Sequence, residues 1–510
     1  MNDPVSEPSS SLVLILGLGE TGVAAARWCA RAGARLRIAD TREQPAGLSR
    51  LQEILHAGGV QADWRLGQQS FDAALLEGVN QVVLSPGLAP EQEPAVAVLA
   101  QARAAGIEVV GEIELFARAL TQLAQRDDYR PRLLAVTGTN GKTTVTALTR
   151  QLVEAGGLRA RAAGNIGPAA LTALMDALDH DDLPEVWVLE LSSFQLHTTH
   201  SLAADAAVVL NVTQDHLDWH GSMQAYAEAK ARLLRMARTA IVNRNDALTT
   251  AMVAALDGLD VRSFGSDLPT YVGDMGLQTE QGVAWLAACE PNDFDVPAAP
   301  TRRKKDAAAP ARPAGRVVRL MPADALQIRG LHNATNTLAA LALARCLDLG
   351  WGPLLRAARD YTGEPGRVEF VRRIGDVDFI NDSKGTNVGA TVAALEGLGQ
   401  QVVLIAGGLG KGQDFSPLIA PVARHARAVV LIGQDATTIG DALAVTGVPC
   451  QTAATMQAAV RLAMTLAQPG DAVLLSPACA SMDMFRNYVH RGEVFVEAAA
   501  ALALDHGEVA

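Results

Sequence analysis

The sequence predicts an α/β protein that is built from three domains. A chain of 510 residues is too long for a single hydrophobic core. Short apolar runs alternate with Ala-rich helical patterns along most of it, which favours parallel sheets covered by helices. Two glycine-rich loops each follow a strand-like run and precede a helical run. We therefore predict domains over residues 12–128, 129–361 and 362–510, after a disordered start at 1–11.

The composition indicates a globular protein without a nucleic-acid or membrane partner. Hydrophobic residues make up 49% of the chain and charged residues 19%, and no apolar run is long enough to span a bilayer. A formal net charge of −12 argues against binding to nucleic acid. The start MNDPVSEPSSS has no basic region before the first apolar run, so we expect no signal peptide and a cytoplasmic location. The five cysteines lack metal-ligand spacing, which favours reduced thiols.

The first domain opens with a strand, a glycine-rich turn and a helix. In LVLILGLGETGVAAA, Gly17, Gly19 and Gly22 follow an apolar run, and the second run RLRIAD ends at Asp40. Such glycines allow a tight turn, and the helix N-terminus after it can bind a diphosphate. QVVLSPG and EVVG are the next strand-like runs. The glycine pattern by itself fits NAD as well as another ligand with a diphosphate.

The second domain opens with a phosphate-binding loop. LLAVTGTNGKTT is followed by the helical pattern VTALTRQLVEAGG, so backbone amides of the loop are expected to hold phosphates. Lys142 is expected to neutralise the β- and γ-phosphates, and Thr143 to offer its hydroxyl to Mg²⁺. The general signature G-x-x-x-x-G-K-[ST] is not met, because Val136 stands at its first glycine.

Two polar side chains follow later strands of this domain and are candidate metal ligands. Glu190 ends the strand-like part of VWVLELSS, and His216 follows AAVVLNV. Strand ends in open α/β sheets face the ligand crevice, although either residue alone could also be structural. Lys230 lies on a helical run, and the residue pattern alone favours a solvated surface lysine there.

The third domain contains the strand-like runs FIND, QVVLIAGG, AVVLIG and AVLLSP. Before it, residues 290–315 are rich in Pro and Ala and carry the basic run Arg302 to Lys305. We predict a disordered insertion between two strands at this place. A docking tail for an anionic partner is the alternative.

Several segments together resemble the Mur ligase family, from Leu12 to about residue 500 and excluding the 290–315 insertion. They are TGTNGKTT, AGNIG, LELSSFQL, NVTQDHLD, AYAEAK, LHNATN, INDSKGTN, GGLGKGQDFSP and SPACASMDMFRNYVHRGEVF. INDSKGTN and the last segment resemble the branch that adds D-glutamate more than its sister ligases or folylpolyglutamate synthetase. The chain has no Asp-Asn-Pro-Arg motif of the kind that reads diaminopimelate.

The resemblance implies a fold and a reaction. It implies an N-terminal Rossmann-like domain that binds UDP, a central P-loop ATPase-like domain and a C-terminal Rossmann-like domain that binds the amino acid. ATP phosphorylates the carboxyl of UDP-N-acetylmuramoyl-L-alanine, and the amine of D-glutamate attacks the acyl phosphate, in peptidoglycan biosynthesis. The partners implied are these small molecules, and the family suggests a monomer with two Mg²⁺ sites.

The resemblance also assigns residues of the ATP and metal sites. Catalytic roles are implied for Lys142, His216, Lys230, Lys384 and Lys411. ATP contacts are implied for Gly138, Thr139, Asn140, Gly141, Lys142, Thr143, Thr144, Asn333, Asn336, Arg367 and Asp382. Metal contacts are implied for Thr143, Glu190, His216 and Lys230, the last as a carbamate. A carbamate forms on a neutral amine, so the resemblance replaces the surface-lysine interpretation of Lys230 with one in which its pKa is lowered.

The remaining assignments concern the other two substrates. The UDP-substrate is expected at Thr21, Asp40, Thr41, Arg42, Gly87, Asn165 and Ser192, so that Asp40 meets uracil rather than the ribose of NAD. The D-glutamate pocket is expected at Lys384, Thr386, Lys411, Ser481 and Tyr488, which supply cations and donors for two carboxylates.

Two residues depart from the family pattern. Glu20 stands near the expected diphosphate, where an acid is unfavourable unless it points away. Gly366 replaces a histidine before Arg367. Three alternatives stay open: a sister ligase for another amino acid, a nicotinamide-dependent oxidoreductase, and a regulatory nucleotide-binding protein without catalysis.

Overall fold

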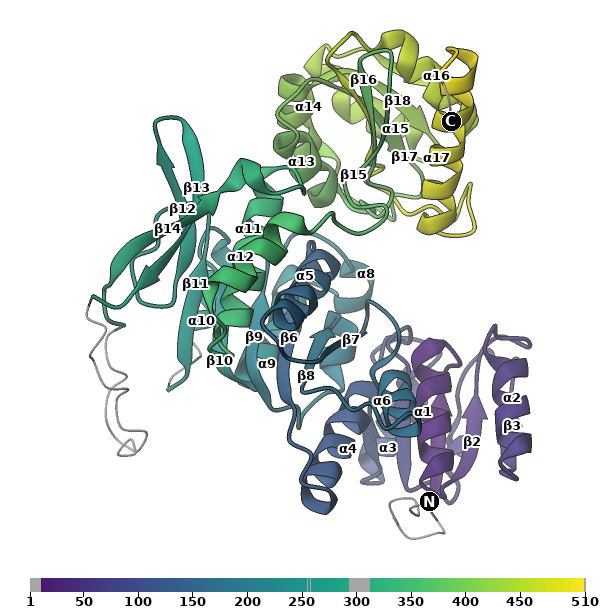
Figure 1. Cartoon of the computed structure of the whole chain (residues 1–510). Helices are drawn as coiled ribbons and strands as arrows, with labels where there is room; N and C mark the ends of the chain where they lie inside the picture. Colours follow the sequence, from purple (N-terminus) through teal and green to yellow (C-terminus); the bar gives the residue numbers. More distant parts are fainter. Residues whose placement is uncertain (1–10, 255, 257, 293–311, 509–510) are drawn as a thin grey trace.

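The computed structural model describes residues 11–254, 256, 258–292 and 312–508, and its three sheets each form the centre of one body (Figure 1). The α/β class with three domains is therefore confirmed. Residues 1–10 of the predicted disordered start and 293–311 of the predicted insertion lie outside the described residues. The two strands that flank the insertion are antiparallel neighbours, β13 (Val283–Glu290) and β14 (Arg316–Pro322).

The first sheet is parallel, with five strands in the order β3-β2-β1-β4-β5. Its strands are β1 (Leu12–Leu16), β2 (Arg35–Ala39), β3 (Ala62–Arg65), β4 (Gln81–Leu84) and β5 (Glu108–Val110). The helical segments are α1 (Glu20–Arg31), α2 (Leu48–Ala57), η1 (Ala73–Leu76), α3 (Val96–Ala104) and α4 (Glu112–Arg126). The strand order reverses between β1 and β4, which is where open α/β sheets bind ligands.

The glycines after β1 are required by close packing. Gly17 has a φ of +88°, and a Cβ at Gly22 would lie 1.9 Å from the carbonyl oxygen of Gly17. Helix α1 can therefore begin directly above the turn only with glycine at position 22.

The second sheet has nine strands in the order β14-β13-β12-β11-β10-β9-β6-β8-β7, and its β12–β13–β14 end is antiparallel. Its other strands are β6 (Arg132–Thr137), β7 (Ala160–Gly164), β8 (Val186–Glu190), β9 (Ala204–Val209), β10 (Ala237–Asn243), β11 (Asp260–Phe264) and β12 (Met275–Glu280). The helical segments are α5 (Lys142–Ala155), α6 (Ala170–Asp179), α7 (Ser193–His197), α8 (Leu217–His220), α9 (Met223–Arg235), α10 (Ala247–Val253), η2 (Ala323–Ala325), α11 (Leu331–Arg345) and α12 (Trp351–Asp360).

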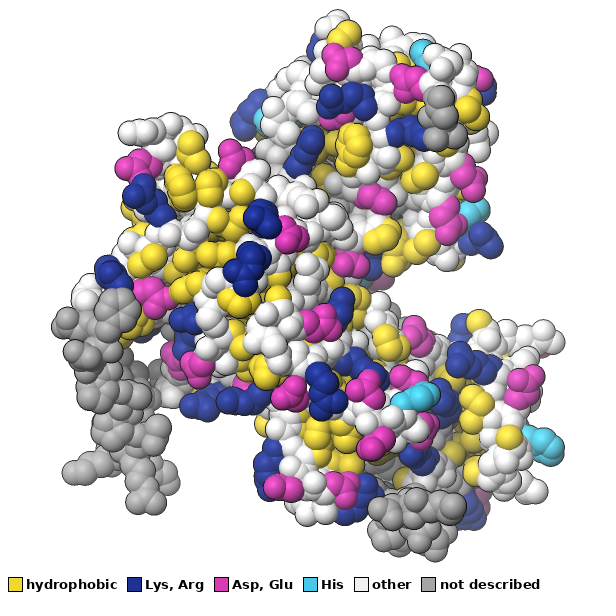
Figure 2. Space-filling model, in the orientation of Figure 1, with side chains coloured by type: hydrophobic (Ala, Val, Ile, Leu, Met, Phe, Trp, Pro, Cys, Tyr) yellow, Lys and Arg dark blue, Asp and Glu magenta, His cyan; other side chains and the backbone are white. Residues whose placement is uncertain are grey.

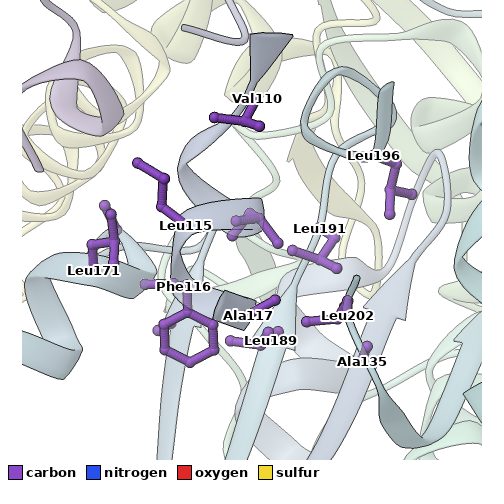
Figure 3. Close-up of a cluster of buried hydrophobic side chains, with 14 of the residues drawn as sticks. Val110, Leu115, Phe116, Ala117, Ala135, Leu171, Leu189, Leu191, Leu196 and Leu202 are labelled. Atoms are coloured by element: carbon purple, nitrogen blue, oxygen red, sulfur yellow. The ribbon is translucent and has the colours of Figure 1, made fainter. Parts of the chain in front are cut away.

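Helix α4 joins the first two bodies through one hydrophobic cluster (Figure 3). Phe116 packs edge-on against Trp187 of the second sheet, with ring centroids 5.3 Å apart. Leu115 and Ala117 of α4 belong to the same cluster as Leu171 of α6 and Leu189 of β8. The first two bodies therefore share a continuous core, and the predicted boundary after residue 128 falls just beyond the helix that joins them.

The third sheet has six strands in the order β15-β16-β20-β17-β18-β19, of which only β15 runs antiparallel to its neighbour. Its strands are β15 (Glu369–Ile374), β16 (Val377–Asn381), β17 (Val402–Gly407), β18 (Ala426–Ile432), β19 (Cys450–Thr452) and β20 (Ala472–Leu475). The helical segments are α13 (Val388–Gly397), η3 (Ser416–Leu418), α14 (Ile419–His425), α15 (Ala436–Leu443), η4 (Ala444–Thr446), α16 (Met456–Leu466) and α17 (Tyr488–Asp505).

The surface carries charges of both signs. On the face drawn in Figure 2, Lys and Arg side chains are interspersed with Asp and Glu, and a hollow opens between the first and third bodies. Within the part of the chain that the structure describes, no helix is long and apolar enough to cross a membrane.

Candidate active site

The loop between β6 and α5 has the backbone shape of a phosphate-binding loop. Gly141 precedes α5 with a φ of +83°, and a Cβ there would lie 2.6 Å from Oδ1 of Asn336. Lys142 is the first helical residue, and its Nζ donates to the carbonyl oxygens of Gly138 (2.9 Å) and Thr139 (2.8 Å). Burial lowers the pKa of Lys142. The predicted ATP loop is thus packed directly against α11.

Thr143 and Glu190 lie together at the start of α5 and the end of β8. The Thr143 hydroxyl donates to Oε2 of the buried Glu190 at 2.8 Å, and Asn165 donates to Oε1 at 2.7 Å. Arg367, which comes from the chain entering the third body, donates to the Thr143 hydroxyl. The neighbouring hydroxyl and carboxylate oxygens are ligands that suit Mg²⁺.

A metal ion at this place would need further ligands from outside the protein. Among the residues that the structure describes, no three His, Cys, Asp or Glu side chains are grouped to hold an ion. Mg²⁺ commonly completes its coordination with water and substrate phosphates, so the donor set fits an ion that arrives with a nucleotide.

Lys230 is buried, so the surface-lysine interpretation is wrong. Its side chain is 1% exposed, and its Nζ donates to the carbonyl oxygen of Gly138 at 2.8 Å and lies 4.4 Å from the ring centre of Tyr226. Burial lowers the pKa of Lys230 well below its usual range, and the charge of Lys142 adds to this effect. Two amines thus converge on one carbonyl oxygen of the ATP loop.

His216 stands beside the same loop with a φ of 54°. Its Nδ1 lies 3.6 Å from Oδ1 of Asp215, and its ring centre is 4.7 Å from that of Phe194. Burial lowers the pKa of His216, and Lys142 and Lys230 add to this, while Asp215 opposes it. A neutral imidazole is the form that binds metals.

A cavity of about 260 Å³ lies next to the ATP loop and between the second and third bodies. Of the residues predicted to contact ATP, it is lined by Asn140, Gly141, Thr144, Asn333, Asn336, Arg367 and Asp382. Asn243 and Phe264, which end β10 and β11, also line it and were missed. The strand-end rule used for Glu190 could not find them, because β10 and β11 had not been predicted as strands.

Asp382 lines this cavity from the third body, and Gly366 supports the lining residue Lys384. Asp382 accepts a 2.6 Å hydrogen bond from the Ser476 hydroxyl, and burial raises its pKa to about 7. Gly366 has a φ of +72°, and its carbonyl oxygen accepts from the Lys384 amide at 3.1 Å. The missing histidine is therefore replaced by a left-handed turn that fixes the backbone of Lys384.

A second cavity of about 280 Å³ lies between the His216 segment and the third body. It is lined by four residues predicted for D-glutamate, Thr386, Lys411, Ser481 and Tyr488. Lys384 lines the cavity next to the ATP loop instead, but its Nζ donates to the Tyr488 hydroxyl at 3.1 Å. Lys384 thus connects the two cavities.

Arg491 is a residue near this second cavity that the sequence reasoning missed. It is fully buried and donates to the carbonyl oxygens of Cys479 (3.0 Å) and Ser383 (2.8 Å). These two contacts hold the segments that carry Ser481 and Lys384. It lies within the quoted segment SPACASMDMFRNYVHRGEVF, but no role was assigned to it, because a helical arginine shows its burial only through contacts that are distant in the chain.

The rarity of lysine is a signal that would have pointed to Lys230. The chain has six lysines, and Lys304 and Lys305 lie outside the described residues. The other four all belong to the ATP loop region or line the two cavities, namely Lys142, Lys230, Lys384 and Lys411. Almost all other cations are arginine, so a lysine in this chain indicates a specific need for an amine.

The residues predicted for the UDP-substrate do not form one connected site within the described part of the chain. Asp40 accepts hydrogen bonds from the Leu18 amide (2.7 Å) and from the Arg42 guanidinium (2.7 and 2.8 Å). Burial alone would raise the pKa of Asp40, but these bonds hold it below its ordinary value. Asn165 contacts Glu190, and Ser192 caps α7.

Glu20 points toward the second body. Its Oε1 accepts from the backbone amide of Ala169 at 3.3 Å, at the start of α6. The acid is therefore engaged by a helix N-terminus, which favours negative charge.

Comparisons with known proteins cover all three bodies. The family model described as Mur ligase MurD-like, N-terminal domain, matches residues 11–111. The Mur ligase middle domain matches residues 136–283, and the Mur ligase, glutamate ligase domain, matches residues 366–479. The ATP loop and Glu190 fall in the second match, and Lys384 and Lys411 in the third.

Curated relatives match nearly the whole chain. Proteins of Bordetella bronchiseptica and Bordetella avium are 71% and 72% identical over 506 and 505 residues, covering 99% of each chain. One of Ralstonia nicotianae is 57% identical over 500 residues, covering 98% of each. All three are named UDP-N-acetylmuramoylalanine–D-glutamate ligase.

Solved structures share the fold. UDP-N-acetylmuramate–alanine ligase of Thermotoga maritima matches with a TM-score of 0.54 at 18% identity, over 96% of this chain and 99% of that one. The MurF ligase of Thermotoga maritima, solved with ADP, also has a TM-score of 0.54, at 15% identity, over 85% of this chain and 90% of that one. Because its motifs, its three domain matches and its highly identical relatives agree, the chain belongs to the Mur ligase family.

Proposed function

We propose that this protein is an ATP-dependent ligase that joins D-glutamate to UDP-N-acetylmuramoyl-L-alanine in peptidoglycan biosynthesis. The observation that carries the proposal is the pair of neighbouring cavities bridged by Lys384 and Tyr488. One cavity adjoins the ATP loop and the other gathers cations and hydroxyls. The names of the relatives, which match across 99% of the chain, support the same substrate pair.

The reaction needs ATP because a carboxylate is a poor electrophile. In the first step a carboxylate oxygen of the UDP-substrate bonds to the γ-phosphorus and the bond to ADP breaks. In the second step the amine of D-glutamate attacks the acyl carbon, loses a proton, and phosphate leaves with the carboxylate oxygen. Both steps move negative charge, and preorganised cations stabilise such charge most effectively.

The residues around the ATP loop suit this charge movement. Lys142 and Arg367 both lie at the start of α5, where the β- and γ-phosphates are expected. Thr143 and Glu190 would hold one Mg²⁺, with His216 and a carbamylated Lys230 at a second ion. When bound, Mg²⁺ would neutralise phosphate charge. Buried Lys230 fits the modification because its lowered pKa favours the neutral amine.

The second cavity suits a dicarboxylic amino acid. Lys411 supplies a cation there, and Thr386, Ser481 and Tyr488 supply hydroxyl donors. Lys384 adds a second cation at the boundary with the nucleotide cavity. Charge-assisted hydrogen bonds of this kind are the strong ones, so two carboxylates can be held at fixed positions.

We assign the UDP-substrate to the first domain, 12–128, ATP to 129–361 and D-glutamate to 362–510. Thr21, Asp40, Thr41 and Arg42 remain the proposed contacts of the UDP group, and Gly87 and Asn165 remain on the path to the muramoyl group. Ser192 remains a proposed contact of the UDP-substrate. The hollow between the first and third bodies supports this arrangement (Figure 2). We place the enzyme in the cytoplasm, as a monomer that acts in cell-wall formation and division.

Phosphate release tests the proposed function. The protein is mixed with ATP, Mg²⁺ and UDP-N-acetylmuramoyl-L-alanine, and with D-glutamate, L-glutamate, L-lysine or no amino acid. We expect release with D-glutamate alone. Release with another amino acid would move the protein to a sister activity, and no release with any of them would contradict a ligase.

A further inference from the structure

Asn387 uses every hydrogen-bonding position of its side-chain amide. It is 4% exposed and stands between Thr386 and the first residue of α13. Its Oδ1 accepts from the amide of Ala390 (2.9 Å) and from Nδ2 of Asn140 (3.2 Å). Its Nδ2 donates to Oδ1 of Asn140 (3.0 Å) and to Oδ2 of Asp215 (3.2 Å). An amide offers two donors and two acceptor sites, so all four hydrogen-bonding positions of this side chain are occupied.

The two partners of Asn387 belong to different parts of the site. Asn140 lies in the ATP loop, where Asn211 fixes its backbone by accepting from its amide (2.8 Å) and donating to its carbonyl oxygen (3.1 Å). Asp215 lines the amino-acid cavity beside His216. Thr386, the neighbour of Asn387, lines that cavity as well. One side chain of the third body thus contacts the nucleotide site and the amino-acid site together.

A glycine two residues further along the chain, in the first turn of α13, allows this close approach. A Cβ at Gly389 would lie 2.9 Å from the Thr213 hydroxyl and 3.3 Å from Nδ2 of Asn140. The bare backbone lets the first turn of α13 reach the ATP loop, and any side chain there would push the two apart.

We propose that Asn387 is a positioning residue that couples the amino-acid pocket to the ATP loop. The reciprocal amide pair with Asn140 seats the third body on the ATP loop, and this seating places Thr386 opposite Asp215 across the amino-acid pocket. The inference rests on the proposed function. Its consequence is that D-glutamate binds well only when the ATP loop is ordered around nucleotide, which makes the two affinities depend on each other.

The variant Asn387→Asp separates this role from folding. Aspartate caps a helix as well as asparagine does, so α13 keeps its first hydrogen bond. The variant loses both donors and sets a carboxylate against Asp215 and Oδ1 of Asn140. The matched control is Thr455→Asp, which adds the same charge at an exposed helix cap of the same body, where Thr455 accepts from Ala458 at 3.2 Å.

The measurement is the KM for D-glutamate at several ATP concentrations. For Asn387→Asp we expect this KM to rise about tenfold, as loss of a charge-assisted hydrogen bond predicts, and to lose its dependence on ATP. The affinity for ATP without D-glutamate is expected to stay unchanged, but the gain in ATP affinity that D-glutamate gives wild type should be lost, because coupling between two sites is reciprocal. Thr455→Asp is expected to behave as wild type.

An unchanged KM for D-glutamate in Asn387→Asp would overturn the proposal, as would a loss of ATP affinity already in the absence of D-glutamate. If Asn387→Asp fails to fold by circular dichroism, Asn387→Ser decides the matter, because serine caps the helix but is too short to reach Asn140. Wild-type protein without D-glutamate-dependent phosphate release would instead refute the proposed function, so the two failures are distinguishable.

Discussion

Lys230 shares an acceptor with a second amine, and this changes its chemistry. Its Nζ and that of Lys142 both donate to the carbonyl oxygen of Gly138. Two ammonium groups so placed repel each other, and burial penalises the charged form further, which lowers the pKa of Lys230. The neutral amine is the form that can add carbon dioxide, so the site favours the proposed carbamate.

We expect Lys230→Ala to lose roughly a hundredfold or more in turnover, comparable to removing a preorganised charge from an active site. Short carboxylic acids should restore part of the activity, because they can replace the anionic group. With ¹³C-bicarbonate, wild type should show a carbamate carbon signal that Lys230→Ala lacks. Full activity of the plain variant would remove the carbamate proposal.

Glu112 is a buried acid at the first turn of α4, where the first and second bodies meet. It is 3% exposed, and its Oε1 accepts from the Leu171 amide at 2.5 Å. Within the described part of the chain, Oε2 has no hydrogen-bond partner. Burial raises the pKa of Glu112 from 4.5 to about 7, and the charge of Glu20 adds to this.

A raised pKa makes stability depend on pH in a defined direction. The folded protein holds the Glu112 proton more tightly than the unfolded chain, so this contribution is full below pH 4.5 and is lost as pH rises through about 7. The free energy of unfolding of Glu112→Gln should therefore rise relative to that of wild type between pH 5 and 8, by up to about 3 kcal/mol. Thermal unfolding across pH measures it, with exposed Glu53→Gln as control. A difference that stays constant with pH would contradict this account.

At the residue scale, sequence reasoning predicted which side chains lie together where a motif fixed the residue. The ATP loop and the Thr143–Glu190 pair follow from a strand, a glycine-rich loop and a strand end. Lys230 could not be placed by pattern alone, since a lysine on an amphipathic helix reads the same whether it faces solvent or a buried carbonyl. Asn387 and Arg491 depend on contacts between segments far apart in the chain, which no local pattern contains.

At the scale of elements, α5 shows how one glycine links a loop to a neighbouring helix. Gly141 and Gly157 stand at the two ends of α5, both with positive φ. A Cβ at Gly141 would strike Asn336 of α11, whereas none of the described atoms lies within 4 Å of a Cβ at Gly157. A substitution would therefore strain the backbone at both positions, but only at Gly141 would the new side chain also collide with a neighbour.

We expect Gly157→Ala to lower stability by about 1 kcal/mol through backbone strain alone, without changing the KM for ATP. Gly141→Ala should raise the KM for ATP as well, because its Cβ displaces Asn336 from the nucleotide cavity. Thermal unfolding and steady-state kinetics on both variants measure these effects. Equal KM values for the two variants would show that the contact with Asn336 is unimportant.

The strands that the sequence analysis did not name include the inner strands β10, β11 and β12 of the second sheet, and several edge strands. β3, β15 and β19 stand at the edges of their sheets, and each is short or partly exposed. ADWR and CQT contain too few apolar residues to show a strand pattern, so pairing with an already formed neighbour decides their structure. The central strands β1, β8 and β17 are buried throughout and were recognised as apolar runs.

At the scale of the whole molecule, the three bodies are joined differently. One hydrophobic cluster runs through α4 from the first body into the second (Figure 3). The clusters of the third body contain only its own residues. Its hydrogen bonds to the ATP loop come from Arg367 and Asn387. Polar contacts exchange with water at little net cost, so the third body is the one expected to move.

We expect the third domain to rotate toward the other two when nucleotide and UDP-substrate bind. Small-angle scattering should then give a smaller radius of gyration with both ligands than without them. An identical radius in the two states would rule out this closure. Asn387→Asp should reduce the change, since it removes one of the contacts that seat the third body.

In the proposed reaction, an oxygen of the substrate carboxylate becomes part of the released phosphate. The direct test is UDP-N-acetylmuramoyl-L-alanine labelled with ¹⁸O in its terminal carboxylate, incubated with ATP, Mg²⁺ and D-glutamate. An acyl phosphate formed before amide bond formation predicts one labelled oxygen in each phosphate released. Phosphate without label, formed in step with the amide product, would contradict this reaction.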